Sequence, residues 1–309
     1  MVKNRKTEQI GERDFVSSAA FQKAFRKTKW KQISLYIIIS VLTVCAIIFF
    51  LQAGSKALIN KKFEQEMERL TEQIHGTPGK GAGIVDLDAS ISYGFLSAEG
   101  KFTYYKKMGD RLIPWEIVTK EYPAIGDVKQ TNPTRVEVFY TSKLERTVRY
   151  NHLNNEREID FYYPHIGYHQ LPNELEIATG LDENTLIEVA LSFVRPMKQE
   201  ELGEIIGGEN VEWLWIDKSN AEHFNELHYS ESDFFHVMHG DDAYGLPVSE
   251  DSPYWENNDS TIEIPGVEST NTEYLISGAI VSGTPSELKR FKEIDIIRAS
   301  VIGLTIDKY

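Results

Sequence analysis

The sequence contains almost no cysteine. Its single cysteine, Cys45, lies within an apolar run, so the chain can form neither an internal disulfide framework nor a cysteine-ligated zinc site. Packing must therefore hold any folded part together, and fifteen Tyr, fifteen Phe and five Trp supply material for a core.

Motifs of familiar catalytic sites are also absent. We find no nucleophile elbow, no convincing catalytic triad and no paired-carboxylate motif. Gly76–Gly83 (GTPGKGAG) superficially resembles a phosphate-binding loop, but it lacks Gly-Lys-Ser/Thr and has no strand before it. We interpret this segment as a linker, and we expect neither an enzyme nor a bound cofactor.

Residue types that bind metals gather in one acidic stretch without the spacing of a known metal site. They are Glu222, His223, Glu226, His228, Asp233, His236, His239, Asp241 and Asp242. The HExxH order is missing, and His223 and His228 do not share one helical face. Because acidic insertions are commonly just solvated, we expect no metal site, and metal binding by this cluster is the less favoured alternative.

Charge, proline and glycine are all missing from Ile33–Leu51 (ISLYIIISVLTVCAIIFFL). As a helix rising about 1.5 Å per residue, this run reaches roughly 28 Å, close to the thickness of the hydrocarbon core of a bilayer. A buried core helix is usually shorter, and a cleavable signal peptide has a shorter apolar core and a shorter leader. The run therefore predicts one uncleaved transmembrane helix at 33–51.

Charge is distributed unequally on the two sides of this run. Residues 1–32 carry nine Lys/Arg against three acids, a net charge of +6, and five of the bases lie within Lys23–Lys31. The positive-inside rule then places the amino terminus in the cytoplasm. The chain carries −14 in all, which leaves −20 for residues 52–309, and we expect that part outside the cell membrane. Such an acidic part repels phosphate backbones, so direct binding of nucleic acid is not expected.

The basic arm at 1–32 ends in a predicted amphipathic helix. Apolar and small residues recur at helical spacing from Phe21 to Thr28, and basic residues occupy the other faces. Two interpretations remain open: the arm lies on anionic lipid, which attracts basic residues, or it binds a cytoplasmic partner. The candidate partner-binding residues are Phe21, Lys23, Phe25 and Arg26.

A helical stalk and a Gly/Pro hinge are predicted at 52–80. Apolar residues at spacings of 4, 4, 3 and 4 form a heptad seam: Ile59, Phe63, Met67, Leu70 and Ile74. The seam covers only about two and a half heptads. Packing against the rest of the chain fits this short seam as well as a homodimer through Ile59–Ile74 does. The glycines of Gly76–Gly83 then predict a hinge that breaks helix and strand alike.

The remaining chain predicts an α+β architecture. Alternating residues and frequent turn signals predict a β-rich subdomain at 81–170. In 171–309, strands at 186–195, 211–217, 273–283 and 296–307 and helices at 197–206 and 287–292 form two β-α-β units separated by a turn-rich insertion at 218–272. This order predicts a ferredoxin-like split β-α-β sandwich with both helices on one face of an antiparallel sheet.

Strand alternation further predicts which side chains share a face of that sheet. The groups are Val189 with Leu191 and Phe193, Trp213 with Trp215, Ile276 with Gly278 and Ile280, and Ile302 with Leu304 and Ile306. We expect the face that carries Val189 to pack against the two helices and the opposite face to meet the β-rich subdomain or solvent.

These runs of residues resemble a known family. They are LIEVALSF, VEWLWID, ISGAIVSGTPSELKRF and IIRASVIG in the last part of the chain, RVEVFY in the middle, and FQKAFRKTKWKQISLYIIISV near the amino terminus. Together they resemble the sigma factor regulator family, the membrane-anchored anti-sigma factors of Gram-positive bacteria. The resemblance implies a cytoplasmic segment that holds an extracytoplasmic-function sigma factor at the membrane, and an outer domain that senses envelope conditions or binds a membrane partner.

Two functional hypotheses follow. In the first, the chain is a single-pass regulator, an anti-sigma factor or an accessory to one, whose inner arm binds a sigma factor or a companion membrane protein. In the second, it is a non-catalytic envelope binding or scaffold module whose arm only anchors it in the lipid bilayer and has no cytoplasmic partner.

Overall fold

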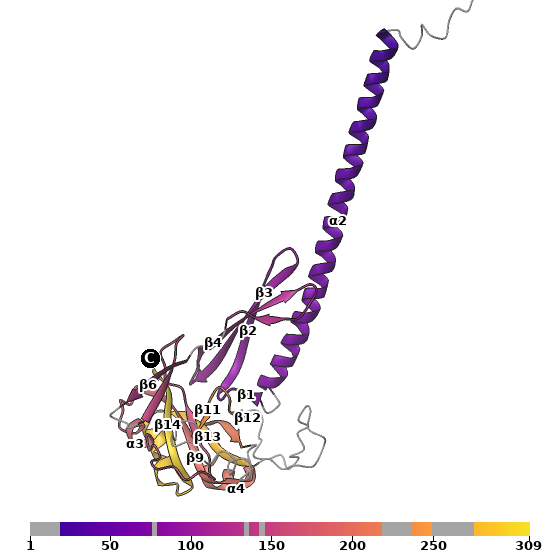
Figure 1. Ribbon diagram of the computed structural model, residues 1–309. Coiled ribbons are helices and arrows are strands. Elements are labelled where there is room, and N and C mark those ends of the chain that lie inside the picture. The colour runs from indigo at the N-terminus through magenta and orange to yellow at the C-terminus, as the bar shows by residue number, and fades with distance from the viewer. Residues whose placement is uncertain (1–18, 76–78, 133–135, 142–145, 218–236, 249–274) are drawn as a thin grey trace, which may run out of the picture. The chain divides into compact units, whose positions relative to one another are not determined.

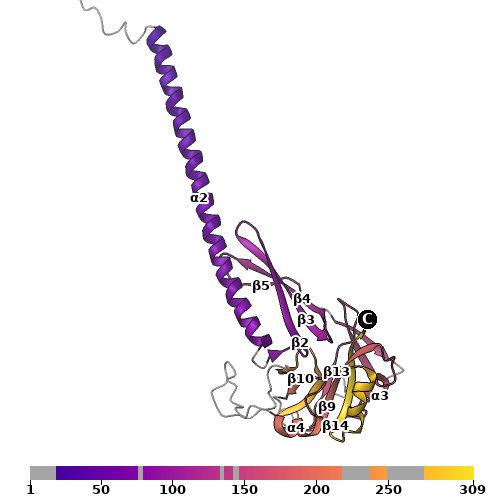
Figure 2. The same ribbon diagram turned by 180° about the vertical axis from the view of Figure 1, so that it is seen from behind.

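The structure is a computed structural model that describes residues 19–75, 79–132, 136–141, 146–217, 237–248 and 275–309. Its contacts divide the chain into two units, one ending at Leu58 and the other comprising Ile59–Tyr309. The architecture is α+β as expected: a long apolar helix near the amino terminus is followed by antiparallel sheets with short helices (Figures 1 and 2).

Helix α2 (Ala19–His75) contains the uncharged run Ile33–Leu51. In the described chain it is the one helix that is long and apolar enough to cross a membrane. Large apolar side chains in this run are between 40% exposed, at Ile33, and 72% exposed, at Phe50. Nothing in the described chain covers them, although a helix that is apolar on all sides is normally buried in protein or in lipid.

The predicted stalk is the end of the same helix, and its apolar seam is buried within the chain. β2 (Ile84–Tyr93), β3 (Ser97–Met108), β4 (Arg111–Pro123) and β5 (Lys129–Gln130) form an antiparallel sheet in that order. Ile59 and Leu70 of α2 pack with Phe102 and Tyr122 of this sheet. The ring of Phe63 lies 5.6 Å from each of those two aromatic rings, measured between centroids.

Of the two alternatives for the seam at Ile59–Ile74, the structure shows packing against the chain's own sheet, which involves Ile59, Phe63, Met67 and Leu70. Ile74 borders the cavity described below. The homodimer through this seam stays an untested prediction. A polar contact accompanies the apolar one, because Lys62 Nζ donates to the carbonyl oxygens of Pro123 and Gly126, each at 2.7 Å. The heptad spacing was informative about which face of the helix is buried, but not about what buries it.

A six-stranded antiparallel sheet forms the larger part of the second unit, in the order β1-β12-β10-β13-β9-β14. The predicted strands are β9 (Thr185–Met197), β10 (Val211–Ile216), β13 (Ile276–Gly283) and β14 (Ile297–Asp307). Their order interleaves the two β-α-β units, since β13 lies between β9 and β10, and β9 lies between β13 and β14.

Two further strands were not predicted. β1 (Gly79–Lys80) pairs with β12 (Tyr244–Pro247), which in turn pairs with β10. The interpretation of Gly76–Gly83 as a break in all regular structure is therefore wrong at Gly79 and Lys80, and part of the predicted insertion belongs to the sheet. Residues 76–78 lie outside the described chain.

Helices cover one face of this sheet, here called the helix side. Leu202 and Ile206 of α4 (Gln199–Ile206) pack with Val189, Leu191 and Phe193 of β9. Leu288 of α6 (Pro285–Leu288) and Phe291 of the following 3-10 helix η2 (Lys289–Glu293) join the same cluster. The predicted inward face of β9 is confirmed.

The helix α6 begins with a capping box, in which Thr284 and Glu287 satisfy each other's backbone N–H groups.

Aromatic residues from 160–163 cover the opposite face, here called the β8 side. β8 (Asp160–Tyr162) pairs with β11 (Val237–His239). Phe161 stacks on Trp215 with ring centroids 5.0 Å apart and on Trp213 at 6.0 Å. The shared face predicted for the two tryptophans is confirmed. The hairpin of β6 (Val136–Thr141) and β7 (Arg146–Asn151) is joined to β8 by the contact of Arg149 with Asp160. The short helix α3 (Leu175–Ala178) instead packs on the helix side, where Leu175 and Ala178 join the cluster of Leu202.

Two of the predicted face assignments are wrong because the strands contain irregularities. The register of β13 shifts between Ile276 and Gly278, so Ile276 packs on the helix side while Ile280 packs on the β8 side. The register of β14 shifts between Ile302 and Thr305, and Leu304 leaves the cluster of Ile302 to pack with Met108 and Trp115. Strict alternation does not survive an extra residue in one strand of a pair.

Replacing Ile59 tests the contact between α2 and the first sheet. Ile59 is 1% exposed whereas its neighbour Leu58 is 51% exposed. Ile59→Ala should lower the free energy of unfolding by about 2–5 kcal/mol, because it leaves a cavity in a packed core. Leu58→Ala should change it by less than about 0.5 kcal/mol. Denaturant unfolding of the full chain in detergent measures both, and equal effects would contradict the burial of this seam.

Candidate functional site

A cavity of about 210 Å³ lies within the second unit, bordered by the end of α2, the first sheet and the six-stranded sheet. Its apolar wall includes Leu70 and Ile74 of α2. Three aromatic side chains also line it: Tyr104, Trp115 and Trp213. Its charged residues are Lys80, Lys106, Glu116, Glu158 and Asp241. This mixture of apolar surface and a few charged groups is typical of ligand-binding sites.

A buried ion pair lies beside the cavity and connects the two large sheets. Lys106 Nζ of β3 lies 2.8 and 3.0 Å from the carboxylate oxygens of Glu188 in β9, and the two side chains are 2% and 5% exposed. The same Nζ lies 4.0 Å from the centroid of the Trp115 ring. Glu188 also accepts a hydrogen bond from Leu304 N at 3.1 Å. A pair that is this deeply buried is strongly destabilised when one partner is removed.

Gly83 brings the chain into contact with this pair. Its φ of +76° is in the left-handed region that favours glycine. A Cβ at this position would lie 3.1 Å from Glu188 Oε1 and 3.3 Å from Ile280 Cδ1. The glycine-rich segment after α2 therefore packs directly over the ion pair, and this close approach explains one of its glycines.

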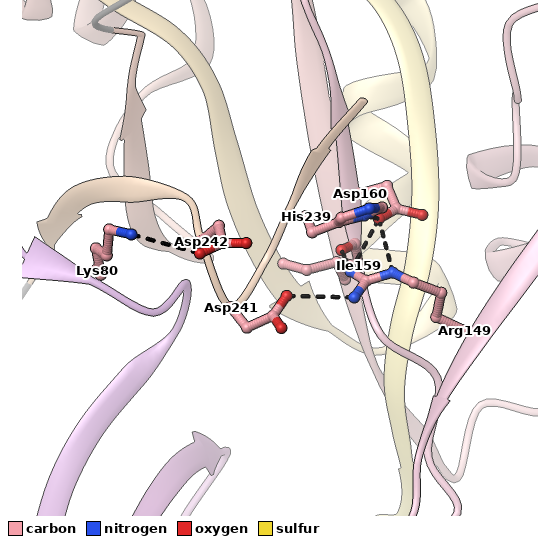
Figure 3. A network of polar contacts seen from close by, with 7 residues as sticks. All are labelled: Lys80, Arg149, Ile159, Asp160, His239, Asp241 and Asp242. Atoms are coloured by element: carbon pink, nitrogen blue, oxygen red, sulfur yellow. Dashed lines mark hydrogen bonds and ion pairs between the residues drawn. The ribbon is translucent and has the colours of Figure 1, made fainter. Parts of the chain in front are cut away.

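A second group of charges surrounds Arg149 of β7 (Figure 3). Its guanidinium donates to Asp160 Oδ1 at 2.9 and 3.2 Å, to the carbonyl of Ile159 at 3.2 Å and to Asp241 Oδ1 at 3.2 Å. His239 Nδ1 lies 2.7 Å from the same Asp160 oxygen. Burial alone would raise the pKa of Asp160, but the hydrogen bond with His239 and the charge of Arg149 outweigh it and hold that pKa below its ordinary value.

Glu158 lies close to both the Lys106–Glu188 pair and the charges around Arg149, but its carboxylate is hydrogen-bonded to neither group. It is 4% exposed and lines the cavity. Its backbone N donates to the carbonyl of Arg149 at 2.9 Å, but its carboxylate makes no hydrogen bond to any side chain or backbone group of the described residues. Burial raises the pKa of Glu158 to about 7; Lys106 and Arg149 oppose the rise, and Asp241 and Glu188 add to it.

The arrangement favours binding rather than covalent chemistry. Among the described residues that line the cavity there is no Ser, Thr, Cys or His, and its one buried amine, Lys106, is already paired with Glu188. What the cavity offers instead is a buried carboxyl group next to aromatic and aliphatic side chains. Such a group can accept a proton near neutral pH or face a positively charged ligand.

The candidate partner-binding residues proposed from the sequence do not line the cavity. Phe21, Lys23, Phe25 and Arg26 belong to α2 in the first unit. The side chains of Lys23, Phe25 and Arg26 are exposed, Phe25 to 60%, whereas that of Phe21 lies outside the described residues. On a helix, Lys23 and Arg26 are neighbours on one face, because residues three apart lie side by side.

The acidic stretch at 222–242 is described only in its last part. Glu222, His223, Glu226, His228, Asp233 and His236 lie outside the described residues. His239 and Asp241 belong to the charges around Arg149, and Asp242 lies 3.4 Å from Lys80 on the surface (Figure 3). Among the residues that the structure describes, no group of three or more His, Cys, Asp or Glu side chains is placed to hold a metal ion.

Three residues of the site, Lys106, Glu158 and Glu188, were not singled out from the sequence. A signal for Glu188 existed, because it is the one charged residue in the apolar strand LIEVALSF. A charge inside a buried strand requires a partner. The sequence does not say that the partner is Lys106, which is far away in the chain.

Glu158→Gln tests the environment of the buried carboxyl group. The pKa of Glu158 is about 7 when folded, above its ordinary value of 4.5, so between these pH values the folded chain binds more protons than the unfolded chain. Its contribution to stability therefore falls as the pH rises through that window. Unfolding in urea measures this. The free energy of unfolding of Glu158→Gln, relative to that of the wild type, should be about 1–3 kcal/mol higher at pH 8 than at pH 5.

The exposed Glu204 provides the matched control, since Glu204→Gln removes the same charge from the surface of α4. Its stability relative to the wild type should be the same at both pH values. A Glu158→Gln difference that is also independent of pH would show that the carboxyl group is not desolvated as described.

Comparison with known families assigns part of the chain. Residues 179–275 match the family model described as sigma factor regulator C-terminal. The match includes β9, α4, β10 and β12 and ends just before β13, so the run GAIVSGTPSELKRF lies beyond it. No curated protein matches the chain, and no solved structure matches it. The family implies a regulatory rather than a catalytic role, and a sigma factor as the partner. The chain therefore carries the C-terminal domain of the sigma factor regulator family over residues 179–275.

Proposed function

We propose that this chain is a single-pass membrane regulator, an anti-sigma factor or an accessory to one, that holds an extracytoplasmic-function sigma factor at the membrane. The observation that carries the proposal is the match of residues 179–275 to the sigma factor regulator C-terminal family. The second unit then belongs outside the cytoplasm, where it receives an input from the cell envelope.

Exposure and charge of α2 support the membrane anchor. The apolar side chains of Ile33–Leu51 are exposed all round the helix, and lipid would cover them. Basic residues precede this run while the rest of the chain is strongly acidic. Both features favour an amino terminus in the cytoplasm and a second unit, with its split β-α-β sheet, on the other side.

The inner arm is the proposed contact with the partner. Lys23 and Arg26 project from one helical face near the exposed ring of Phe25, and a positive patch next to an aromatic ring suits an acidic surface with an apolar centre. The partner in this proposal is the sigma factor itself or a companion membrane protein that holds it.

A second candidate function is a non-catalytic envelope binding or scaffold module. The observation that favours it is that Lys23–Lys31 would also be explained by anionic lipid alone, because each basic residue near such a surface gains about 1 kcal/mol. In that case the arm has no cytoplasmic protein partner, and the second unit carries the whole function.

Capture of the sigma factor separates the two functions. Full-length protein purified from membranes should co-purify an extracytoplasmic-function sigma factor, and Lys23→Ala/Arg26→Ala should reduce the captured amount at least tenfold by removing the contact. Lys27→Ala/Lys29→Ala removes the same charge from the same helix and should retain most of the sigma factor. Quantitative mass spectrometry measures both. If no variant and no wild-type sample captures a sigma factor, the scaffold function is the better one.

Reporter fusions test the orientation. A reporter after Tyr309 should be active outside the cytoplasm, and one at the amino terminus inside it. Neutralising Lys27, Lys29 and Lys31 should weaken this bias, because the excess of positive charge on the cytoplasmic side sets it. Lys56→Gln/Lys61→Gln, after the apolar run, should not weaken it. A cytoplasmic carboxy terminus in the wild type would contradict the proposed topology.

A further inference from the structure

We propose that the cavity of the second unit is a binding site for an organic ammonium ion with a compact apolar body, and that Glu158 is the group that recognises the positive charge. The proposal deepens the proposed function, because such a ligand would be an envelope input to the regulator. It stands on the position of Glu158, on the charges around it and on the side chains that line the cavity.

The first step concerns the carboxylate of Glu158. It is nearly inaccessible, it lines the cavity, and it makes no hydrogen bond to the residues that the structure describes. Its oxygens are not among the fully buried side-chain atoms without a partner, so they meet the open space of the cavity rather than packed protein. A carboxylate in such a poorly solvated space is stabilised by a charged partner. A bound cation would supply the missing partner.

The second step concerns the neighbouring charges. Lys106 is already bound to both oxygens of Glu188, and Arg149 is bound to Asp160 and Asp241. The two buried cations nearest to Glu158 are thus matched by other carboxylates. What remains is an excess of negative charge, so the cavity favours a cation and disfavours an anion.

The third step concerns the walls. Tyr104, Trp115 and Trp213 present aromatic rings, while Leu70 and Ile74 present aliphatic groups. Aromatic faces attract ammonium groups, as Lys106 Nζ above Trp115 demonstrates within this chain. The aliphatic side chains suit an apolar body attached to the charge. An organic ammonium ion satisfies both, whereas a hydrated divalent metal ion requires about six oxygen ligands.

The size of the cavity limits the ligand. Its volume of about 210 Å³ is smaller than the roughly 300–1,000 Å³ of pockets for drug-sized molecules. The site therefore suits a small amine or the ammonium end of a larger molecule, such as the headgroup of a lipid. Because Leu70 and Ile74 of α2 and Trp213 of β10 line the same cavity, a bound ligand would contact both α2 and the sigma factor regulator domain.

Titration of the full-length protein with 2-phenylethylammonium tests this site. The protein in detergent at pH 8 should bind this ion with a change in tryptophan fluorescence, since Trp115 and Trp213 line the cavity. The uncharged analogue 2-phenylethanol and the anion 3-phenylpropionate should bind at least tenfold more weakly. Equal binding of the alcohol would overturn the proposal, because the cavity would then recognise only the apolar body.

Glu158→Gln should weaken binding of 2-phenylethylammonium at least tenfold while leaving the shape of the side chain unchanged. Asp242→Asn is the matched control, since Asp242 is next to Asp241 but 66% exposed at the surface, and it should change the affinity less than twofold. Thermal melts of both variants establish that they are folded. Unchanged affinity of a folded Glu158→Gln variant would overturn the role of Glu158.

The pH dependence gives an independent readout. With a pKa of about 7 for Glu158, ionisation rises about tenfold between pH 6 and pH 8, and the affinity of the wild type should rise with it. The charged and titratable groups facing Glu158 are Lys106, Arg149, Glu188 and Asp241. The affinity of Glu158→Gln should be flat over this range, and a tenfold rise in that variant would assign the effect to another group and overturn the proposal.

Two sources of the ammonium group can be separated in nanodiscs. If a lipid headgroup is the natural ligand, phosphatidylethanolamine in the disc should compete with 2-phenylethylammonium, whereas phosphatidylglycerol alone should not. If neither lipid competes, the phosphatidylethanolamine headgroup is excluded as the source of the ammonium group. Ammonium binding without sigma factor capture would reject the proposed function alone, and capture without ammonium binding would reject this inference alone.

Discussion

The buried ion pair between Lys106 and Glu188 is the interaction on which the second unit depends. Lys106 belongs to the sheet against which α2 packs, and Glu188 belongs to β9, which lies between β13 and β14 in the six-stranded sheet. Removing two charges from water is expensive, and the attraction offsets this only when geometry and further hydrogen bonds are good. Here Trp115, Leu304 N and the close approach of Gly83 complete the environment of the pair. The pair therefore fixes one relative position of the two sheets, and the cavity exists beside it.

Patterns within short stretches of the sequence predicted the long helix, the main strands and several of their buried faces. The uncharged run Ile33–Leu51 predicted a helix because its length and composition suffice. The alternation around Val189 and the spacing of the two tryptophans predicted strands and their buried faces, and the resulting sheet has the interleaved strand order expected of two β-α-β units. The family resemblance held over residues 179–275 for the same reason, since LIEVALSF and VEWLWID are strands of the core.

Features that join distant residues could not be predicted in this way. The heptad seam of α2 identified a buried face, yet only the structure shows that Phe102 and Tyr122 bury it. Strand alternation failed at Ile276 and Leu304, where the register of the strand pairs shifts. The cavity combines residues from α2, six strands of the two sheets and the turn before β12, and no spacing in the sequence connects Lys106, Glu158 and Asp241. A lone acid in an apolar strand, as at Glu188, is the signal most useful for finding such a site.

The position of β9 also decides when the sheet can form during synthesis. Its hydrogen-bonding partners on both sides, β13 and β14, are the last two strands of the chain. At about 5–20 residues per second, β9 leaves the ribosome several seconds before either partner exists, with apolar side chains on both of its faces. The six-stranded sheet is thus completed only once the residues up to Asp307 have been made, and until then the apolar faces of β9 lack their partner strands.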